Sequence, residues 1–228
     1  MSKLKVINSN KIIEVQNVFC AGRNYADHIA EMAEPGNKVE IPTEPVIFLK
    51  PNSSVANDFS YVKVPEIKKK KISSDLQNEV ELVVVIGKDG HNISEDAAMQ
   101  YVFGYAVGID FTLRDLQAES KKTGMPWAIS KGFFTSAPVS DIVLKRDLPD
   151  AENLDIKLSI NGEMHQSSNT SHMIFKIKYI IHYISSIFTL CKGDIIFTGT
   201  PAGITTLKTG DIVEASIEKI GKLTVRIG

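Results

Sequence analysis

Short apolar runs rich in β-branched residues, separated by polar and glycine-containing segments, dominate the hydrophobic pattern of this chain. Such runs are typical of buried strands. We expect strands at residues 15–20, 46–50, 79–86, 105–110, 154–160, 194–198, 211–216 and 223–227. Asn161 and Gly162 predict a two-residue antiparallel hairpin between residues 158–160 and 163–165, because both central residues of a type I′ turn need a positive φ.

Helical periodicity is clearest at residues 173–188, where isoleucines and Phe188 recur at spacings of three and four. Ser171 is the expected N-cap of this helix. Shorter helices are expected at residues 24–33, 94–103 and 114–122, the first two capped by Asn24 and Ser94. Strands outnumber helices and do not alternate with them. The pattern therefore predicts an α+β, mixed-β architecture rather than a doubly wound sheet or a βα barrel.

The length of 228 residues and an apolar content of 43% allow one well-buried core, so residues 1–228 are expected to form a single domain. Its 26 basic and 27 acidic residues are balanced, which predicts neither a nucleic-acid nor a membrane partner. The lysines at residues 68–71 are interpreted as a solvated loop or edge.

The two cysteines, Cys20 and Cys191, lie in apolar surroundings and are interpreted as small buried hydrophobes in a reducing, cytoplasmic setting. The N-terminal residues lack the apolar stretch of a signal peptide. No uncharged apolar run approaches the ~18 residues of a membrane span, so we expect a soluble protein.

Glu79 and Glu81 head the most apolar run of the chain, residues 79–86. Side chains alternate along a strand, so both carboxylates point to the same side. Because burying either charge without compensation is costly, a cation is expected between them. In the alternative interpretation both face solvent at the start of the strand and pair with the lysines of residues 68–71.

Asp110 ends a second apolar run, residues 105–110, and adds a third carboxylate at a strand end. Oxygen donors of this kind suit Mg²⁺ or Mn²⁺ better than zinc, because no Cys or His lies beside them. The convergence of Glu79, Glu81 and Asp110 therefore predicts a site for a hard divalent cation.

His28 and Glu31 lie one turn apart if residues 24–33 are helical. A carboxylate beside an imidazole fixes its tautomer and stabilises its protonated form, as a general base near neutral pH requires. The alternative is an exposed ion pair of little consequence. The turn-rich residues 33–38 that follow are expected to let the helix act as a lid.

Lys131 interrupts an apolar segment and, if it points inward, can neutralise an anionic substrate or a developing enolate. Its alternative is a lysine with a buried stem and a solvated ammonium. Residues 198–203, Thr-Gly-Thr-Pro-Ala-Gly, are small enough to let backbone N–H groups approach an anion, and are otherwise a tight turn. They lack the lysine and spacing of a nucleotide-binding P-loop.

Six segments together resemble the fumarylacetoacetate hydrolase family, in its short acylpyruvase and oxaloacetate decarboxylase branch. They are residues 20–28, 48–51, 78–82, 104–115, 124–131 and 193–201. The resemblance runs from about residue 16 to the C-terminus and leaves residues 1–15 as a lead-in. It implies a mixed β-sandwich roll with short peripheral helices, in a homodimer.

The resemblance also implies roles for individual residues. Glu79, Glu81 and Asp110 are expected to bind Mg²⁺ or Mn²⁺, and His28 with Glu31 to activate water. Lys131 and Gln117 are expected to neutralise the developing oxyanion. Arg23, Arg114 and Thr200 are the expected contacts to a substrate carboxylate.

The implied activity is metal-dependent cleavage of a carbon–carbon bond in small 2-oxo or β-diketo acids, as in acylpyruvate hydrolysis or oxaloacetate decarboxylation. One alternative is isomerisation or tautomerisation of an oxo-acid intermediate of aromatic degradation. Another is a non-catalytic oxo-acid-binding protein.

Overall fold

The computed structural model describes residues 2–33 and 40–228. Its centre is a mixed six-stranded sheet in the order β14-β11-β10-β17-β3-β4, in which only β17 and β3 are parallel. The strands are β3 (Val18–Gly22), β4 (Val46–Lys50), β10 (Val80–Ile86), β11 (Val102–Ile109), β14 (Val143–Leu144) and β17 (Ile195–Phe197).

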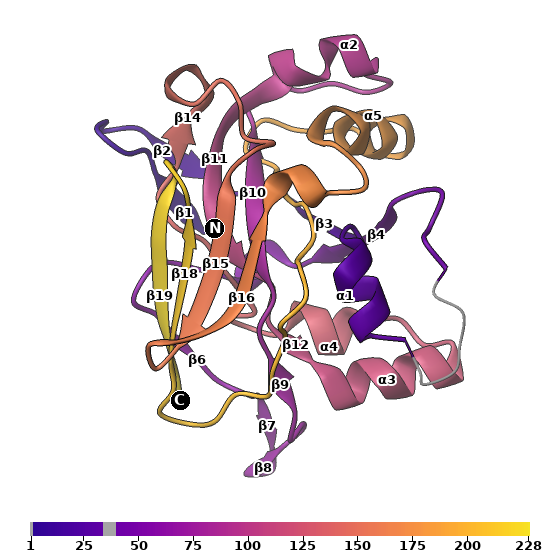
Figure 1. Ribbon diagram of the computed structural model, residues 1–228, viewed down its shortest axis with the longest axis vertical. Helices are drawn as coiled ribbons and strands as arrows, with labels where there is room; N and C mark the ends of the chain where they lie inside the picture. The colour runs from indigo at the N-terminus through magenta and orange to yellow at the C-terminus, as the bar shows by residue number, and fades with distance from the viewer. Residues whose placement is uncertain (1, 34–39) are drawn as a thin grey trace.

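A five-stranded sheet in the order β16-β15-β18-β19-β6 packs against the central sheet (Figure 1). Leu158, Val213 and Leu223 of this second sheet share a core cluster with Val84 and Tyr105 of the first. The strands are β6 (Tyr61–Val62), β15 (Asp155–Ile160), β16 (Glu163–Asn169), β18 (Ile212–Ile217) and β19 (Gly221–Ile227). The expected α+β sandwich roll is confirmed.

The opposite face of the central sheet is also buried. Val83 and Val85 of β10 pack there with Leu4 and Val6, which a short N-terminal hairpin brings to this face. The remaining strands form four two-stranded pairs: β1 (Lys3–Lys5) with β2 (Ile12–Glu14), β5 (Val55–Ala56) with β13 (Ala137–Pro138), β7 (Glu66–Ile67) with β8 (Lys70–Lys71), and β9 (Leu76–Gln77) with β12 (Thr112–Leu113).

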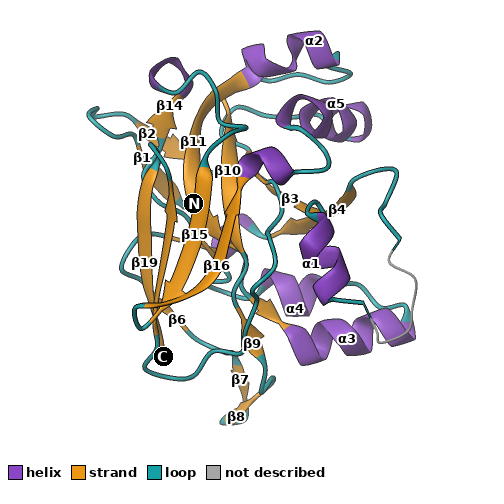
Figure 2. Ribbon diagram, viewed as in Figure 1, coloured by secondary structure: helices purple, strands orange, loops and turns teal. Residues whose placement is uncertain are grey.

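Short helices surround the sheets in two groups (Figure 2), with α2 and α5 near one end and α1, α3 and α4 beside the other. The α-helices are α1 (Ala26–Glu31), α2 (Glu95–Ala98), α3 (Arg114–Thr123), α4 (Ala128–Gly132) and α5 (Ile177–Ile187). The 3₁₀ helices are η1 (Asn52–Ser54), η2 (Met99–Tyr101), η3 (Lys145–Asp147) and η4 (Thr170–His172).

The predicted hairpin at Asn161 and Gly162 is confirmed, because β15 and β16 pair antiparallel and these residues have φ values of 52° and 85°. The predicted strand at 46–50 matches β4, whereas that at 15–20 begins later, at Val18. The helix predicted at 94–103 is wrong at its end. Val102 and Phe103 already belong to β11, since the apolar pattern of the strand continues through them.

The two expected caps at Ser171 and Asn24 are wrong. Helix α5 begins at Ile177 after Lys176, and Ser171 lies in η4. The side chain of Asn24 instead donates to the carbonyls of Phe175 and Thr198 and accepts from the Phe175 N–H. Buried polar groups need hydrogen-bond partners. The side chain of Asn24 finds them in two distant segments and is therefore not available to cap the helix. Ser94 precedes α2 but forms no capping hydrogen bond.

Neither cysteine forms a disulfide within the described residues; Cys20 is buried and Cys191 is half-buried rather than buried as expected. In the part of the chain that the structure describes, no helix is both long and apolar enough to cross a membrane. The lid expected at residues 33–38 lies, apart from Ala33, outside the described residues.

Candidate active site

The carboxylates of Glu79, Glu81 and Asp110 converge, and each offers an oxygen within 4.8 Å of the others. Strand alternation explains the placement, because Glu79, just before β10, and Glu81 within it point to the same side of the sheet as Val83. Asp110 follows β11, and its N–H donates to the Glu79 carbonyl at 2.8 Å. All three side chains are buried, Glu81 at 3% exposure. Burial excludes the interpretation in which both glutamates face solvent.

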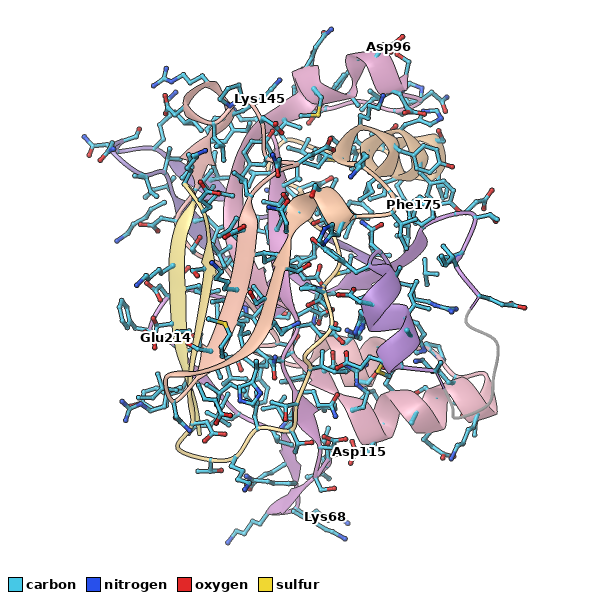
Figure 3. The ribbon with its side chains drawn as sticks, in the orientation of Figure 1. Lys68, Asp96, Asp115, Lys145, Phe175 and Glu214 are labelled. Carbon is cyan, nitrogen blue, oxygen red and sulfur yellow. The ribbon has the colours of Figure 1, made fainter. Side chains whose placement is uncertain are left out.

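The lysines of residues 68–71 cannot pair with this cluster, because they lie on the β7–β8 hairpin. Figure 3 shows Lys68 at the far tip of the molecule, pointing away from the body. Their interpretation as a solvated edge is confirmed.

Lys131 is a buried cation at the cluster, but it bridges Glu79 and Asp110 rather than the expected pair of Glu79 and Glu81. From α4 its Nζ donates to Glu79 Oε2 at 2.7 Å and to Asp110 Oδ2 at 2.8 Å. Burial alone would lower the pKa of Lys131, but Asp110 and Glu79 outweigh it and raise that pKa. Its raised pKa keeps the ammonium charged near neutral pH. Lys131 is 3% exposed, so the alternative of a solvated ammonium is wrong.

Lys50, which the sequence analysis missed, is a second buried cation at the cluster. Its Nζ lies 2.7 Å from Asp110 Oδ1 and also donates to the Lys131 carbonyl and to Ser136 Oγ. The signal was a charged residue at the end of the apolar run 46–50. That signal is weak, because lysines commonly end strands with a solvated head.

Arg114 at the start of α3 holds the other side of the cluster. Its NH2 pairs with Glu79 Oε1, its Nε donates to Gln77 Oε1 at 2.8 Å, and its NH1 donates to Gln117 Oε1 at 2.7 Å. Burial would raise the pKa of Glu79, but Lys131 and Arg114 outweigh it and hold that pKa well below its ordinary value. Glu79 is therefore ionised throughout the neutral range.

Glu81 differs from its two neighbours because, within the described residues, it forms no ion pair. Its Oε2 accepts the N–H of Gly199 at 2.6 Å. Burial, with the charges of Asp110 and Glu79, raises its pKa well above the ordinary value. A buried carboxylate that lacks a cation, beside two further oxygen donors, fits the donor set of a hard divalent ion.

Glycine is required where the turn at residues 198–203 approaches Glu81. Gly199 has φ +99°, and a Cβ there would lie 2.6 Å from the Cβ of Asn24. The expectation that backbone N–H groups of this turn approach an anion is met by the Glu81 carboxylate itself.

His28 and Glu31 meet on α1, with His28 Nδ1 3.1 Å from Glu31 Oε2. Glu31 Oε1 also accepts the N–H of Gly203 at 3.0 Å, so the pair is tied to the turn that carries Thr200. Burial opposes ionisation of Glu31, but the hydrogen bonds from His28 and Gly203 outweigh it and lower its pKa. With Nδ1 engaged, Nε2 is the nitrogen left for chemistry. His28 is 8% exposed, which excludes a fully solvated surface pair.

A cavity of about 540 Å³ brings the candidates together. The acidic cluster, Lys131 and His28 line it, as do Arg23, Arg114, Gln117 and Thr200. Arg23 donates to the Glu40 carbonyl at 3.1 Å, and Thr200 is 3% exposed. Lys121 and Trp127, which the sequence analysis did not single out, also contribute to the wall. Every predicted site residue except Glu31, which supports His28 from behind, lines this one cavity.

The sequence and the fold are those of a known enzyme family. The model of the fumarylacetoacetate hydrolase C-terminal family matches residues 17–228, and the chain belongs to that family.

Individual relatives and solved structures that resemble this chain have names that state an activity. The protein of Bos taurus named mitochondrial oxaloacetate tautomerase FAHD1 is 46% identical over 212 residues, covering 93% of this chain and 91% of the relative. The structure of fumarylpyruvate hydrolase from Pseudomonas aeruginosa, in complex with Mn²⁺ and pyruvate, has a TM-score of 0.92 at 33% identity and covers 99% of this chain and 95% of that one.

The 2-hydroxyhepta-2,4-diene-1,7-dioate isomerase of Mycobacterium marinum has a TM-score of 0.80 at 33% identity, covering 94% of this chain and 75% of that one. These names describe enzymes of small oxo and hydroxy-diene acids. The chain is accordingly an enzyme of the fumarylacetoacetate hydrolase family that processes small oxo acids.

Proposed function

We propose that this protein catalyses the keto–enol tautomerisation of oxaloacetate, or of a closely similar 2-oxo dicarboxylate, with Mg²⁺ or Mn²⁺ bound. The observation that carries the proposal is the cluster of buried carboxylates beside a charged lysine at a cavity that also holds His28. From the sequence alone, bond cleavage is the first expectation and tautomerisation the second. The name of the 46% identical relative moves tautomerisation to first place.

Glu79, Glu81 and Asp110 are the residues that would hold the ion. The unpaired charge of Glu81 supports this assignment, and the related Pseudomonas hydrolase was solved with Mn²⁺. When bound, a divalent ion withdraws electrons from the 2-oxo and carboxylate oxygens of the substrate and makes its C3 hydrogen more acidic.

His28 is the group we assign to proton transfer at C3. Glu31 holds Nδ1 at 3.1 Å, which leaves Nε2 as the base and stabilises the imidazolium that forms. Because Glu31 is itself anchored by Gly203, the imidazole keeps its orientation through the reaction.

Lys131 is assigned to the oxygen of the enolate rather than to carbon. Its pKa is raised by Asp110 and Glu79 over the opposing effect of burial, so it cannot serve as a base near neutral pH. As a buried ammonium it stabilises negative charge on oxygen. Gln117 accepts from Arg114 through Oε1, which leaves its amide NH₂ as a second donor at the cavity wall.

We assign the substrate carboxylate to Arg23 and Thr200. Arg114 was the third expected contact, but its guanidinium bonds to Glu79, Gln77 and Gln117 support a different role for it. We propose that it holds Glu79 ionised and oriented.

Hydrolytic cleavage of an acylpyruvate is the second candidate function, and the His28–Glu31 pair favours it. The same pair can activate a water that attacks the distal carbonyl, while Lys131 stabilises the enolate that leaves. Decarboxylation of oxaloacetate needs the enolate but no water. One site can therefore support all three reactions, and their rates decide the physiological one.

The test compares these rates in purified protein stripped with EDTA and reloaded with Mg²⁺ or Mn²⁺. Tautomerisation is followed by enol absorbance, decarboxylation by pyruvate release, and hydrolysis with acetylpyruvate. We expect metal-dependent tautomerisation, lost in His28→Ala and retained in His91→Ala, an exposed histidine outside the cavity.

Tautomerisation untouched by chelation would contradict the proposal. Faster hydrolysis of acetylpyruvate would put cleavage first. Stabilisation by oxalate and Mg²⁺ without any turnover would instead identify a binding protein.

The cellular setting and assembly also remain proposals. The named Bos taurus relative is mitochondrial, whereas the two cysteines, which form no disulfide within the described residues, support a reducing compartment. We propose a cytoplasmic setting on the cysteines and a homodimer on the family resemblance. Fractionation of cells and light scattering after gel filtration test the two statements separately.

A further inference from the structure

Gln166 connects the start of β10, beside Glu79 and Glu81, to the turn that carries Thr200. It lies on β16 in the five-stranded sheet, outside the cavity lining, and is completely buried. Its Oε1 accepts from Asn78 Nδ2 at 2.9 Å and from the Val80 N–H at 3.0 Å. Its Nε2 donates to Thr200 Oγ1 at 2.9 Å and to the Pro201 carbonyl at 2.8 Å.

The orientation of this amide follows from its partners. The backbone N–H of Val80 can only donate, so the atom that faces it must be the amide oxygen. The carbonyl of Pro201 can only accept, so the atom that faces it must be the amide nitrogen. Rotating the amide by 180° would leave both backbone groups unpaired in a buried site, which is costly. Gln166 therefore donates to Thr200 and cannot accept from it.

This direction determines what the Thr200 hydroxyl can do. A threonine hydroxyl has one proton to donate and lone pairs to accept with. The bond from Gln166 uses a lone pair, and among the described residues it is the only hydrogen bond that Thr200 Oγ1 makes. Since Thr200 lines the cavity, its proton is left for a group inside it.

We propose that Gln166 is a positioning residue that makes the Thr200 hydroxyl a dedicated donor to the substrate carboxylate. The inference rests on the proposed function, which places a 2-oxo acid carboxylate against Thr200. Without Gln166 the hydroxyl is free to rotate and donate to the Pro201 carbonyl, which then lacks a partner. The carboxylate would then face a lone pair instead of a proton.

A purely structural role is the competing explanation, because Gln166 also ties two segments together. Asn78 gives a matched comparison. Its Oδ1 accepts from the Thr205 N–H at 3.2 Å, so it joins the same strand to the same loop without touching Thr200. In Asn78→Leu the amide of Gln166 is still oriented by Val80 and Pro201.

The experiment measures binding of oxalate to the Mn²⁺-loaded protein by calorimetry, at saturating metal. Loss of a hydrogen bond to a charged group is worth about 1.5–3 kcal/mol, so we expect Thr200→Val to bind roughly tenfold or more weakly and Thr200→Ser to bind as the parent does. Gln166→Met should lose most of that factor. The double variant Gln166→Met/Thr200→Val should bind no more weakly than Thr200→Val alone, because no hydroxyl remains to be oriented.

Thermal unfolding separates folding from positioning. Gln166→Met and Asn78→Leu should both lower Tm, but only the former should weaken oxalate binding. If Gln166→Met fails to fold, Gln166→Glu at alkaline pH replaces it, since an ionised carboxylate only accepts and draws the Thr200 proton away from the cavity. The Mn²⁺ affinity, read by electron paramagnetic resonance without oxalate, should be unchanged.

Two results would overturn the positioning role while leaving the proposed function intact. One is a loss of oxalate affinity in the double variant equal to the product of the two single-variant losses. The other is a loss of affinity in Asn78→Leu as large as that in Gln166→Met. Failure of the Mn²⁺-loaded parent to bind any 2-oxo acid or oxalate would overturn both.

Discussion

Glu81→Gln removes the charge of the one cluster carboxylate that forms no ion pair within the described residues, and should stabilise the metal-free protein. At separations up to 4.8 Å and an effective dielectric constant of ~20, Asp110 and Glu79 each repel Glu81 by about 3.5 kcal/mol. Attraction to Lys131 offsets about one of these terms, and the bond from Gly199 to a charged acceptor is worth about 1.5–3 kcal/mol. The net gain is roughly 0.5–2 kcal/mol, or about 1–8 °C in Tm for a chain of this size.

The sign of the pH dependence follows from the raised pKa of Glu81. Burial and its two acidic neighbours lift the folded-state pKa above the unfolded value, so ionised Glu81 costs stability at neutral pH. That cost disappears as the pH falls below the unfolded value. The advantage of Glu81→Gln over the parent should therefore be present at pH 7 and shrink in acid.

Scanning calorimetry of EDTA-treated protein at several pH values tests this reasoning. Glu214→Gln is the control, because Glu214 is an exposed glutamate on β18 (Figure 3). In the presence of Mn²⁺ the order should reverse, with a metal-induced rise in Tm in the parent and none in Glu81→Gln. A metal-free Glu81→Gln protein that melts below its parent, or that still gains stability from Mn²⁺, would refute the assignment of Glu81.

Three further predictions follow from single contacts. Lys131→Met leaves the buried carboxylates of Glu79 and Asp110 without their shared cation, so denaturant unfolding should show a loss of about 3–5 kcal/mol, and turnover should vanish. Gly203→Ala places a Cβ 2.0 Å from the His165 carbonyl at a φ of +103°, so it should lower Tm and reduce kcat by moving the Glu31 anchor; unchanged values for both would contradict this. Hydrogen bonds lower the pKa of Glu31 against the effect of burial. The stability that ionised Glu31 contributes is therefore present above its unfolded-state pKa and is lost as the pH falls through its folded-state pKa. Glu31→Gln should therefore flatten the acid limb of the stability curve measured by thermal unfolding, and an unaltered acid limb would argue against the bond.

Features carried by one short segment could be predicted from the sequence. The alternation that places Glu79 and Glu81 on one side needs only the residues of one strand. The spacing that lets His28 reach Glu31 needs only one helical turn, and the hairpin at residues 161–162 needs only its turn residues.

Features that join distant segments could not be predicted in this way. Lys50 meets Asp110 across 60 positions of sequence, and Gln166 meets Thr200 from the opposite sheet. Asn24 illustrates the same limit, since its local pattern indicates a helix cap but its side chain bonds to residues 151 and 174 positions away. A sequence pattern reports what a residue can bond to, and the packing of the sheets decides which partner it meets.

The cations around the cluster differ in which carboxylates they contact. Glu79 and Asp110 each give one oxygen to a supporting cation, Arg114 or Lys50, and the other to Lys131. Burial opposes ionisation of Glu79, but Lys131 and Arg114 outweigh it and hold the pKa of that carboxyl well below its ordinary value. The ion pairs also fix the orientation of both carboxylates, so these groups need not reorganise when charge develops nearby. Lys131 alone joins both acids, and it also lines the cavity, which is why the proposed function assigns it to the enolate oxygen. Within the described residues Glu81 has only a backbone N–H for a partner, so in the proposed function it is the carboxylate left to take a divalent ion. In the proposed function, a bound divalent ion and Lys131 would therefore act on the same edge of the substrate.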